Sequence, residues 1–84
     1  MNLPNETYNV TDNSDGSFTL AIDSVPNYIQ KDQVNTIVPV DPTVMITMSN
    51  GKNYHIWNWE NEQNLGSTSA QDLADKINTI RNTP

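Results

Sequence analysis

His55 is the only histidine of the 84 residues, and it is the first candidate for acid–base chemistry at neutral pH. A catalytic triad needs a nucleophile and an orienting acid around the imidazole, and no spacing in this chain identifies such a set. Because His55 lies within an apolar and aromatic run, we interpret it as a packed strand residue. No acids with ligand spacing accompany it and cysteine is absent. We therefore predict no catalytic residue, no metal site and no cofactor.

Two groups of carboxylates are the next candidates. The run 12–16, Asp-Asn-Ser-Asp-Gly, resembles a calcium loop, but setting Gly16 at position six of an EF-hand leaves no acid at positions one and twelve. An Asx-rich hairpin turn is the simpler interpretation. Glu60 and Glu62 could be imagined as a glycosidase pair, but a hydrolase needs a closed pocket and both lie in a very polar stretch. We predict that the chain is not an enzyme.

Trp57 and Trp59 are the stronger sign of a functional surface. Trp is enriched at interface hot spots because it offers a large, rigid area with one polar atom. Either the two rings cover the core, or at least one of them is exposed for recognition. Burial is favoured for Trp57, whereas both alternatives stay open for Trp59 at the strand end. Together with Tyr54, the two rings could instead form a stacking surface for a carbohydrate.

A hairpin over residues 43–59 must position these side chains. Two runs of β-branched, aromatic and Met residues flank Asn50-Gly51, which is typical of a two-residue type I′ turn. This turn predicts four facing pairs across the hairpin: Ser49–Lys52, Thr47–Tyr54, Met45–Ile56 and Thr43–Asn58. The opposite face then holds Val44, Ile46, Met48, Asn53, His55 and Trp57.

The rest of the chain predicts a first hairpin and one helix. Residues 7–11 and 17–22 alternate apolar and polar side chains on either side of the 12–16 turn. Residues 68–81 predict an amphipathic helix, opened by a capping box that begins at Thr68 or at Ser69. Its apolar stripe consists of Ala70, Leu73, Ala74, Ile77 and Ile80.

Three segments are less regular. Residues 1–6 look like a flexible arm. Tyr28-Ile29 is either a brief strand or an anchor for a loop. Pro39 and Pro42 confine 37–40 to an edge strand or an extended linker. We predict one α+β domain over 1–84, a small antiparallel sheet of two hairpins with the C-terminal helix packed on one face.

Composition limits the partners. Ten acids against four bases give a formal charge of −6 and a pI near 4.2, which argues against nucleic acid. The N-terminus lacks the pattern of a signal peptide, and no apolar run is long enough to span a membrane. So small a chain without disulfides must be stabilised by a well-packed core or by assembly with other chains.

The central hairpin has more apolar surface than one helix can cover. In the predicted register Met45, Tyr54 and Ile56 share the uncovered face. We therefore predict that these three residues, with Trp59 and with Leu3 of the arm, contact other protein subunits and further copies of this chain.

The C-terminal half resembles small accessory structural proteins of tailed-phage virions. The resemblance rests on a short strand, the turn Ser49-Asn50-Gly51-Lys52, a Trp-rich second strand, and the run 66–77 that opens the helix. It implies a non-enzymatic virion component, either a capsid decoration (cement) protein or a head–tail or neck component, which binds other virion proteins in many copies. The protein would then be soluble in the host cytoplasm before assembly. The alternative from the aromatic residues is a small carbohydrate-binding module that uses Trp57, Trp59 and Tyr54.

Overall fold

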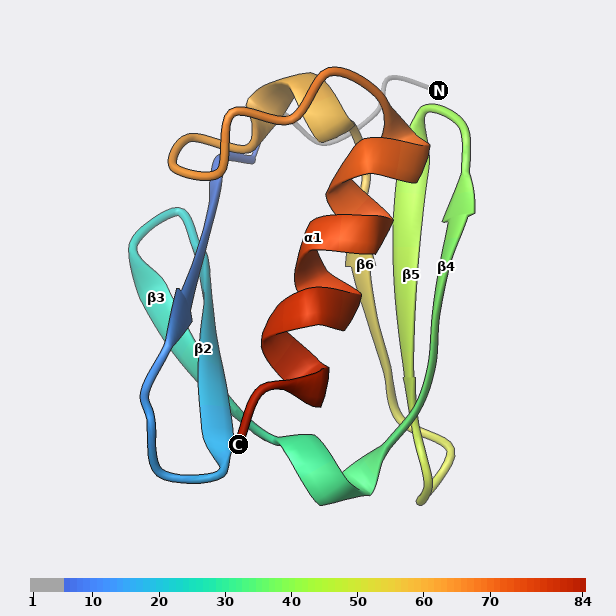
Figure 1. Ribbon diagram of the computed structural model, residues 1–84. Helices are drawn as coiled ribbons and strands as arrows, with labels where there is room; N and C mark the ends of the chain where they lie inside the picture. Colours follow the sequence, from blue (N-terminus) through green and yellow to red (C-terminus); the bar gives the residue numbers. More distant parts are fainter. Residues whose placement is uncertain (1–5) are drawn as a thin grey trace.

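The computed structural model describes residues 6–84, whose strands form two separate three-stranded antiparallel sheets. The strand orders are β1-β2-β3 and β4-β5-β6, so each strand pairs with its neighbour in the chain. Helix α1 runs along the opening between the two sheets (Figure 1). In chain order the elements are β1 (Tyr8–Asp12), β2 (Ser17–Ile22), β3 (Val25–Gln30), the 3-10 helix η1 (Lys31–Gln33), β4 (Val34–Val40), β5 (Thr43–Met48), β6 (Asn53–Ile56), the 3-10 helix η2 (Trp59–Asn61) and α1 (Ala70–Asn82). The predicted α+β class is confirmed, but the two hairpins belong to two sheets rather than one.

The first predicted hairpin is present, with β1 and β2 paired around the 12–16 loop. Asp12 Oδ1 accepts a hydrogen bond from the backbone N–H of Ser14, and Asp15 Oδ1 accepts one from that of Ser17, both at 3.0 Å. The carboxylates therefore bond their own loop, which confirms the Asx-turn interpretation.

The segment after β2 forms a third strand. β3 joins β2 through a two-residue turn at Asp23 and Ser24, whose φ angles are 50° and 69°. Both central residues of a type I′ turn require positive φ, so the type I′ turn lies here. Asp23 Oδ1 also accepts the backbone N–H of Thr7 at 2.8 Å, which ties the turn to the start of β1.

The predicted register of the central hairpin is wrong by one residue. Met48 and Lys52 face each other, with the Met48 N–H bonded to the Lys52 carbonyl at 2.8 Å. Gly51 N–H bonds back to the Met48 carbonyl at 3.0 Å, and Gly51 has φ +89°. The loop is thus three residues long, a type I turn closed by a glycine in the left-handed region.

This slip of one residue exchanges the two faces of β6 relative to β5. The observed pairs are Val44–Ile56, Met45–His55, Ile46–Tyr54 and Thr47–Asn53. Tyr54 and Ile56 therefore lie on the inner face, and Met45 lies on the outer one.

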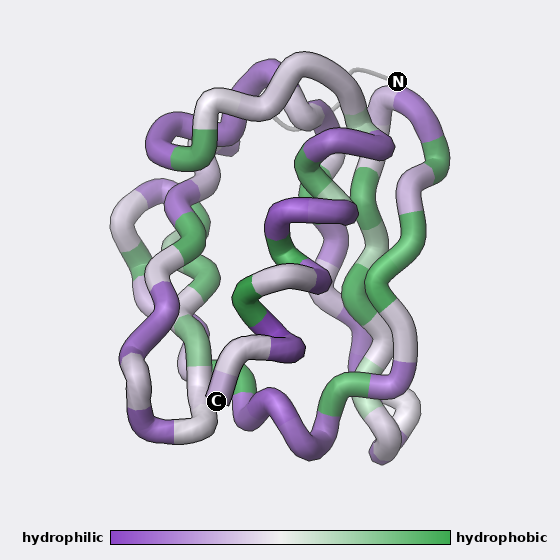
Figure 2. Tube along the Cα trace, in the orientation of Figure 1, coloured by the Kyte–Doolittle hydropathy of each residue, from purple (hydrophilic) through white to green (hydrophobic). Residues whose placement is uncertain are grey.

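The core fills the space between the two sheets and α1. Figure 2 shows apolar stretches in both sheets and along α1, and the buried side chains of all three belong to one core cluster. The helix begins at Ala70, two residues later than predicted. Ser69, one of the two predicted cap residues, is its N-cap, and the Ser69 Oγ accepts the Asp72 N–H at 3.0 Å. Four residues of the predicted stripe are buried, and Ile80 packs at their edge. The fully buried large side chains are Tyr8, Val10, Phe18, Leu20, Ile29, Val44, Ile46, Ile56, Leu73 and Ile77.

The loop before α1 closes the outer edge of β1. Gln63 N–H donates to the Tyr8 carbonyl at 2.8 Å. The Asn64 side chain bonds both backbone groups of Val10, at 2.9 Å to the N–H and at 2.7 Å to the carbonyl. This amide takes the place of a neighbouring strand, so the edge of β1 is satisfied.

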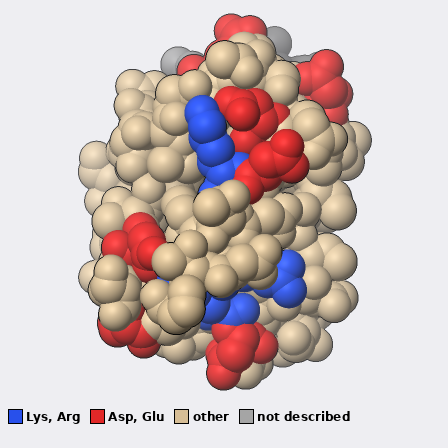
Figure 3. Space-filling view, viewed as in Figure 1, with Lys and Arg blue, Asp and Glu red and all other residues tan. Residues whose placement is uncertain are grey.

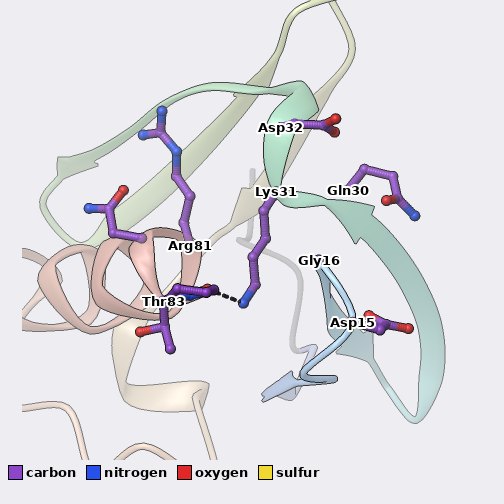
Figure 4. A pocket seen from close by; sticks show the side chains of 9 residues that line it. Asp15, Gly16, Gln30, Lys31, Asp32, Arg81 and Thr83 are labelled. Atoms are coloured by element: carbon purple, nitrogen blue, oxygen red, sulfur yellow. Dashed lines mark hydrogen bonds between the residues drawn. The ribbon is translucent and has the colours of Figure 1, made fainter.

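Lys31 fixes the other end of the molecule. Its Nζ lies 2.9 Å from Asp12 Oδ1 and 2.7 Å from the Thr83 carbonyl, just after α1 (Figure 4). Only 9% of Lys31 is exposed, so this cation is buried with both partners in place. It ties the first hairpin to the end of the helix.

Candidate protein-binding face

The outer side of the second sheet is the surface we consider for function. Cross-strand partners share a face, so Val38, Met45 and His55 form one row across all three strands. Helix α1 packs on the other side, where its stripe shares the core with Val44 and Ile46. We define the outer face as Thr36, Val38, Val40, Thr43, Met45, Thr47, Asn53, His55 and Trp57.

The outer face is uncharged and partly apolar. None of its nine side chains is an acid or a base of the Asp, Glu, Lys or Arg type, although the chain carries a formal charge of −6. Val38 is 41% exposed and Val40 is 58% exposed. Met45, His55 and Trp57 are half-buried. Apolar side chains that adjoin on one sheet face and are exposed form a candidate contact surface for another protein.

The residues that the sequence predicted as an interface do not share one surface. Met45 lies on the outer face, where Val38 and His55 are its cross-strand partners. Ile56 is fully buried, and Tyr54 packs against the core from the inner face. Trp59 also packs against the core, and its backbone N–H donates to the Pro42 carbonyl at 2.9 Å. The fifth predicted residue, Leu3, lies outside the described residues.

The three aromatic rings proposed for carbohydrate stacking lie in different environments. Trp57 stacks on His55 with the ring centroids 3.9 Å apart, and it belongs to the outer face. Tyr54 and Trp59 pack against the core cluster instead. A sugar-binding platform needs rings that share one accessible surface, and these three do not provide it.

His55 lies in the outer face, where its ring stacks on Trp57. Its Nε2 is the only buried side-chain nitrogen or oxygen of residues 6–84 that lacks a hydrogen-bond partner. Within the same residues, no group of three or more histidines and acids is arranged to hold a metal ion.

The two glutamates considered for hydrolysis have separate positions. Glu60 is exposed, whereas Glu62 is 9% exposed. The Glu62 carboxylate accepts the backbone N–H groups of Asn64 and Leu65 and both the N–H and the hydroxyl of Ser67. Glu62 therefore holds the loop before α1, which is a structural role.

Charged side chains gather elsewhere in mixed groups. On the helix side, Figure 3 shows acidic and basic side chains next to one another rather than in patches of one sign. Lys76, for example, pairs with Asp72 at 3.0 Å and bonds the carbonyls of Leu65 and Gly66. An open pocket of about 580 Å³ near the end of α1 has both signs in its lining, with Asp15, Asp32, Lys31 and Arg81.

Three of the acids have a pKa that is lowered by their hydrogen bonds. A hydrogen bond from Lys31 lowers the pKa of Asp12, and hydrogen bonds from Ser17 lower the pKa of Asp15. A hydrogen bond from Lys76 likewise lowers the pKa of Asp72. All three shifts come from structural contacts of loops and of the helix start.

Comparison of the chain with protein-family models, with curated proteins and with solved structures gives no match. Of the helices in residues 6–84, none is long and apolar enough to cross a membrane. The outer face is thus characterised by its geometry alone. Sequence reasoning did not include Val38 and Val40 in the interface, although 37–40 is a run of four apolar residues and successive side chains of a strand point to opposite faces.

Proposed function

We propose that this protein is a non-enzymatic structural subunit that binds another protein through the outer face of β4-β5-β6. The observation that supports this most is the uncharged outer face with exposed Val38 and Val40 on an otherwise acidic chain. Burying such a face removes apolar area from water without desolvating an ion, which favours association.

The resemblance of the C-terminal half to accessory proteins of tailed-phage particles supports a finer proposal. The partner would then be a virion protein, and the chain a decoration or neck component present in many copies. A face spread over three strands suits this role because it offers a broad contact area. Met45 at the centre of the face and Trp57 at its end are the anchors we propose, since buried Trp and Met dominate binding at such surfaces.

The test introduces two negative charges on the outer face. We expect Val38→Glu/Met45→Glu to fold like the wild type and to lose binding to tailed-phage particles. The readout is co-sedimentation of the purified chain with assembled particles that lack it. The matched control is Asn9→Glu/Thr11→Glu, which adds the same charge on β1, where both side chains point away from the core.

The outcomes separate the candidates. Loss of binding in the face variant alone supports the proposal, and equal binding by both variants contradicts the choice of face. If neither the wild type nor the control binds particles, the virion proposal is wrong. Binding of the wild type to a glycan array, with loss in Trp57→Ala, would instead favour a carbohydrate-binding module.

A further inference from the structure

A second surface stands out at the outer edge of β3 in the other sheet. Val25 is 61% exposed and Tyr28 is 70% exposed, the highest values among the large apolar side chains of residues 6–84. β3 pairs with β2 on one side only. Its sequence, Val-Pro-Asn-Tyr-Ile-Gln, contains no charged residue. β3 is therefore an uncharged edge strand with exposed apolar side chains.

The direction of the β3 backbone groups follows from one hydrogen bond at the end of the strand. Lys31 N–H donates to the Gly16 carbonyl at 2.9 Å, and these two residues continue the β2-β3 register. In an antiparallel ladder, bonded and non-bonded pairs alternate. The N–H and carbonyl groups of Tyr28 and Gln30 therefore point away from β2. Pro26 occupies the next outward position, where its missing N–H breaks no bond to β2.

The other sheet edges are occupied or short. The edge of β1 is bonded by Gln63 and Asn64. On β4, the Asn78 side chain donates to the Ile37 carbonyl at 3.1 Å. β6 has only four residues, against six in β3. Within residues 6–84 no hydrogen bond reaches the outward groups of Tyr28 and Gln30, so β3 is a six-residue edge without a partner on its outer side.

We propose that β3 pairs with β3 of a second copy of this chain, antiparallel and around a two-fold axis, to form one continuous six-stranded sheet. A strand that adds to this edge must offer donors and acceptors at alternate residues, and β3 itself does so. Antiparallel pairing of identical strands is isologous, so the contact closes as a dimer.

The register follows from the outward residues. Tyr28 faces Tyr28 of the second copy, where each N–H donates to the other carbonyl. Gln30 N–H then donates to the Pro26 carbonyl of the second copy. This register lies wholly within β3, whereas moving the axis to Ile29 would draw Lys31 of η1 into the ladder.

The absence of charged residues in β3 allows a second copy to approach this edge. Two copies with a formal charge of −6 each repel over most of their surface. The uncharged β3 is a place where they approach without facing acids strand to strand. The proposal leaves the outer face of β4-β5-β6 free, so a dimer would present two such faces.

The experiment measures dimerisation by sedimentation equilibrium over a wide range of concentration. We expect a monomer–dimer equilibrium for the wild type. Tyr28→Pro removes the N–H at the axis but no bond to β2, and should weaken dimerisation roughly 10- to 100-fold through loss of two backbone hydrogen bonds. Asn53→Pro is the matched control, since it places proline at an outward position of β6 and should leave the dimer intact.

Amide hydrogen exchange of the wild type gives an independent readout that needs no variant. The amides of Tyr28 and Gln30 should exchange slowly at high concentration and fast at low concentration. A wild type that stays monomeric at millimolar concentration would overturn the proposal. So would a dimer in which these two amides remain unprotected, or a folded Tyr28→Pro variant that dimerises like the wild type.

Discussion

The Tyr8 hydroxyl accepts a hydrogen bond from the backbone N–H of Trp57 at 3.2 Å, and this contact joins the two sheets. Tyr8 belongs to β1 and is fully buried, while Trp57 follows β6 and carries part of the outer face. The same hydroxyl donates to Glu6 Oε1 at 3.0 Å. One phenol thus positions the end of the proposed binding face from inside the core.

Removing this hydroxyl should weaken the fold. Tyr8→Phe keeps the ring but leaves the Trp57 N–H without its partner, so the free energy of unfolding should fall by about 1–2 kcal/mol. Burial raises the pKa of Tyr8 to about 12, from 10.0. A raised pKa means that the wild type loses stability as the pH rises from 10 through 12.

Urea unfolding at pH 7 and pH 11 measures both effects. In Tyr8→Phe the alkaline loss should be smaller than in the wild type, because the phenol that must ionise is gone. Equal alkaline losses in the two proteins would show that another group controls stability there. The exposed Tyr28→Phe serves as the control, with little change in stability expected at pH 7.

Lys31 should contribute more to the free energy of unfolding than an exposed lysine such as Lys52 does. Lys31→Met keeps the aliphatic stem but leaves Asp12 and the Thr83 carbonyl without their donor. We expect the free energy of unfolding to fall by about 1–3 kcal/mol. Lys52→Met is the control, since Lys52 is exposed and only lies 4.9 Å from the Tyr54 ring centre. Its change should stay within about 0.5 kcal/mol in the same urea titration.

Low pH should weaken the Lys31–Asp12 contact by protonating Asp12. The hydrogen bond from Lys31 lowers the pKa of Asp12 below its usual 3.8. A carboxyl with a depressed pKa stabilises the fold above pH 3.8 and loses that contribution as the pH falls through the folded value. Asp12→Asn should therefore be less stable than the wild type at pH 7, and the difference should narrow below pH 3.8. Thermal unfolding across pH 2–7 measures it, and a constant difference would contradict the linkage.

The patterns that repeat over many residues were read correctly from the sequence. The alternation in 7–11 and 17–22, and the apolar stripe of 68–81, each carry several residues that agree with one period. Pro39 and Pro42 limited 37–40 to an edge strand or an extended linker, and the structure has the first of these, since β4 is an edge strand. These features are local, so no knowledge of the rest of the chain was needed.

The register of the central hairpin could not be read in the same way. Asn50-Gly51 fits a type I′ turn and also a type I turn with Gly51 at the left-handed position, and the two differ by one residue. Both faces of this hairpin are partly apolar, so the pattern did not choose between them. The choice depends on the whole core, where Ile56 meets Val44 and the helix. That is why Tyr54 and Ile56 were placed on the wrong face.

Substitutions at Ser24 and at Gly51, in the two hairpin turns, should change the free energy of unfolding in opposite directions. Ser24 has φ 69° and Gly51 has φ +89°, a region that glycine adopts without strain. Ser24→Gly should therefore raise the free energy of unfolding by a few tenths of a kcal/mol up to about 1. Gly51→Ala meets no neighbouring atom within 4 Å, so its expected loss of about 1 kcal/mol comes from the backbone alone. Chemical denaturation measures both, and a loss in Ser24→Gly would contradict the assignment of this turn.

Replacing the His55 imidazole by an apolar ring should stabilise the fold. Its Nε2 is buried without a partner, which costs about 1–3 kcal/mol relative to a bonded nitrogen. His55→Phe removes that nitrogen and keeps a ring that can stack on Trp57. We expect the midpoint of thermal unfolding to rise by several degrees, as about 1 kcal/mol does in a domain of this size. His55→Ala removes the ring as well and should lower the midpoint. A His55→Phe variant that unfolds at a lower temperature than the wild type would show that the nitrogen has a partner in solution.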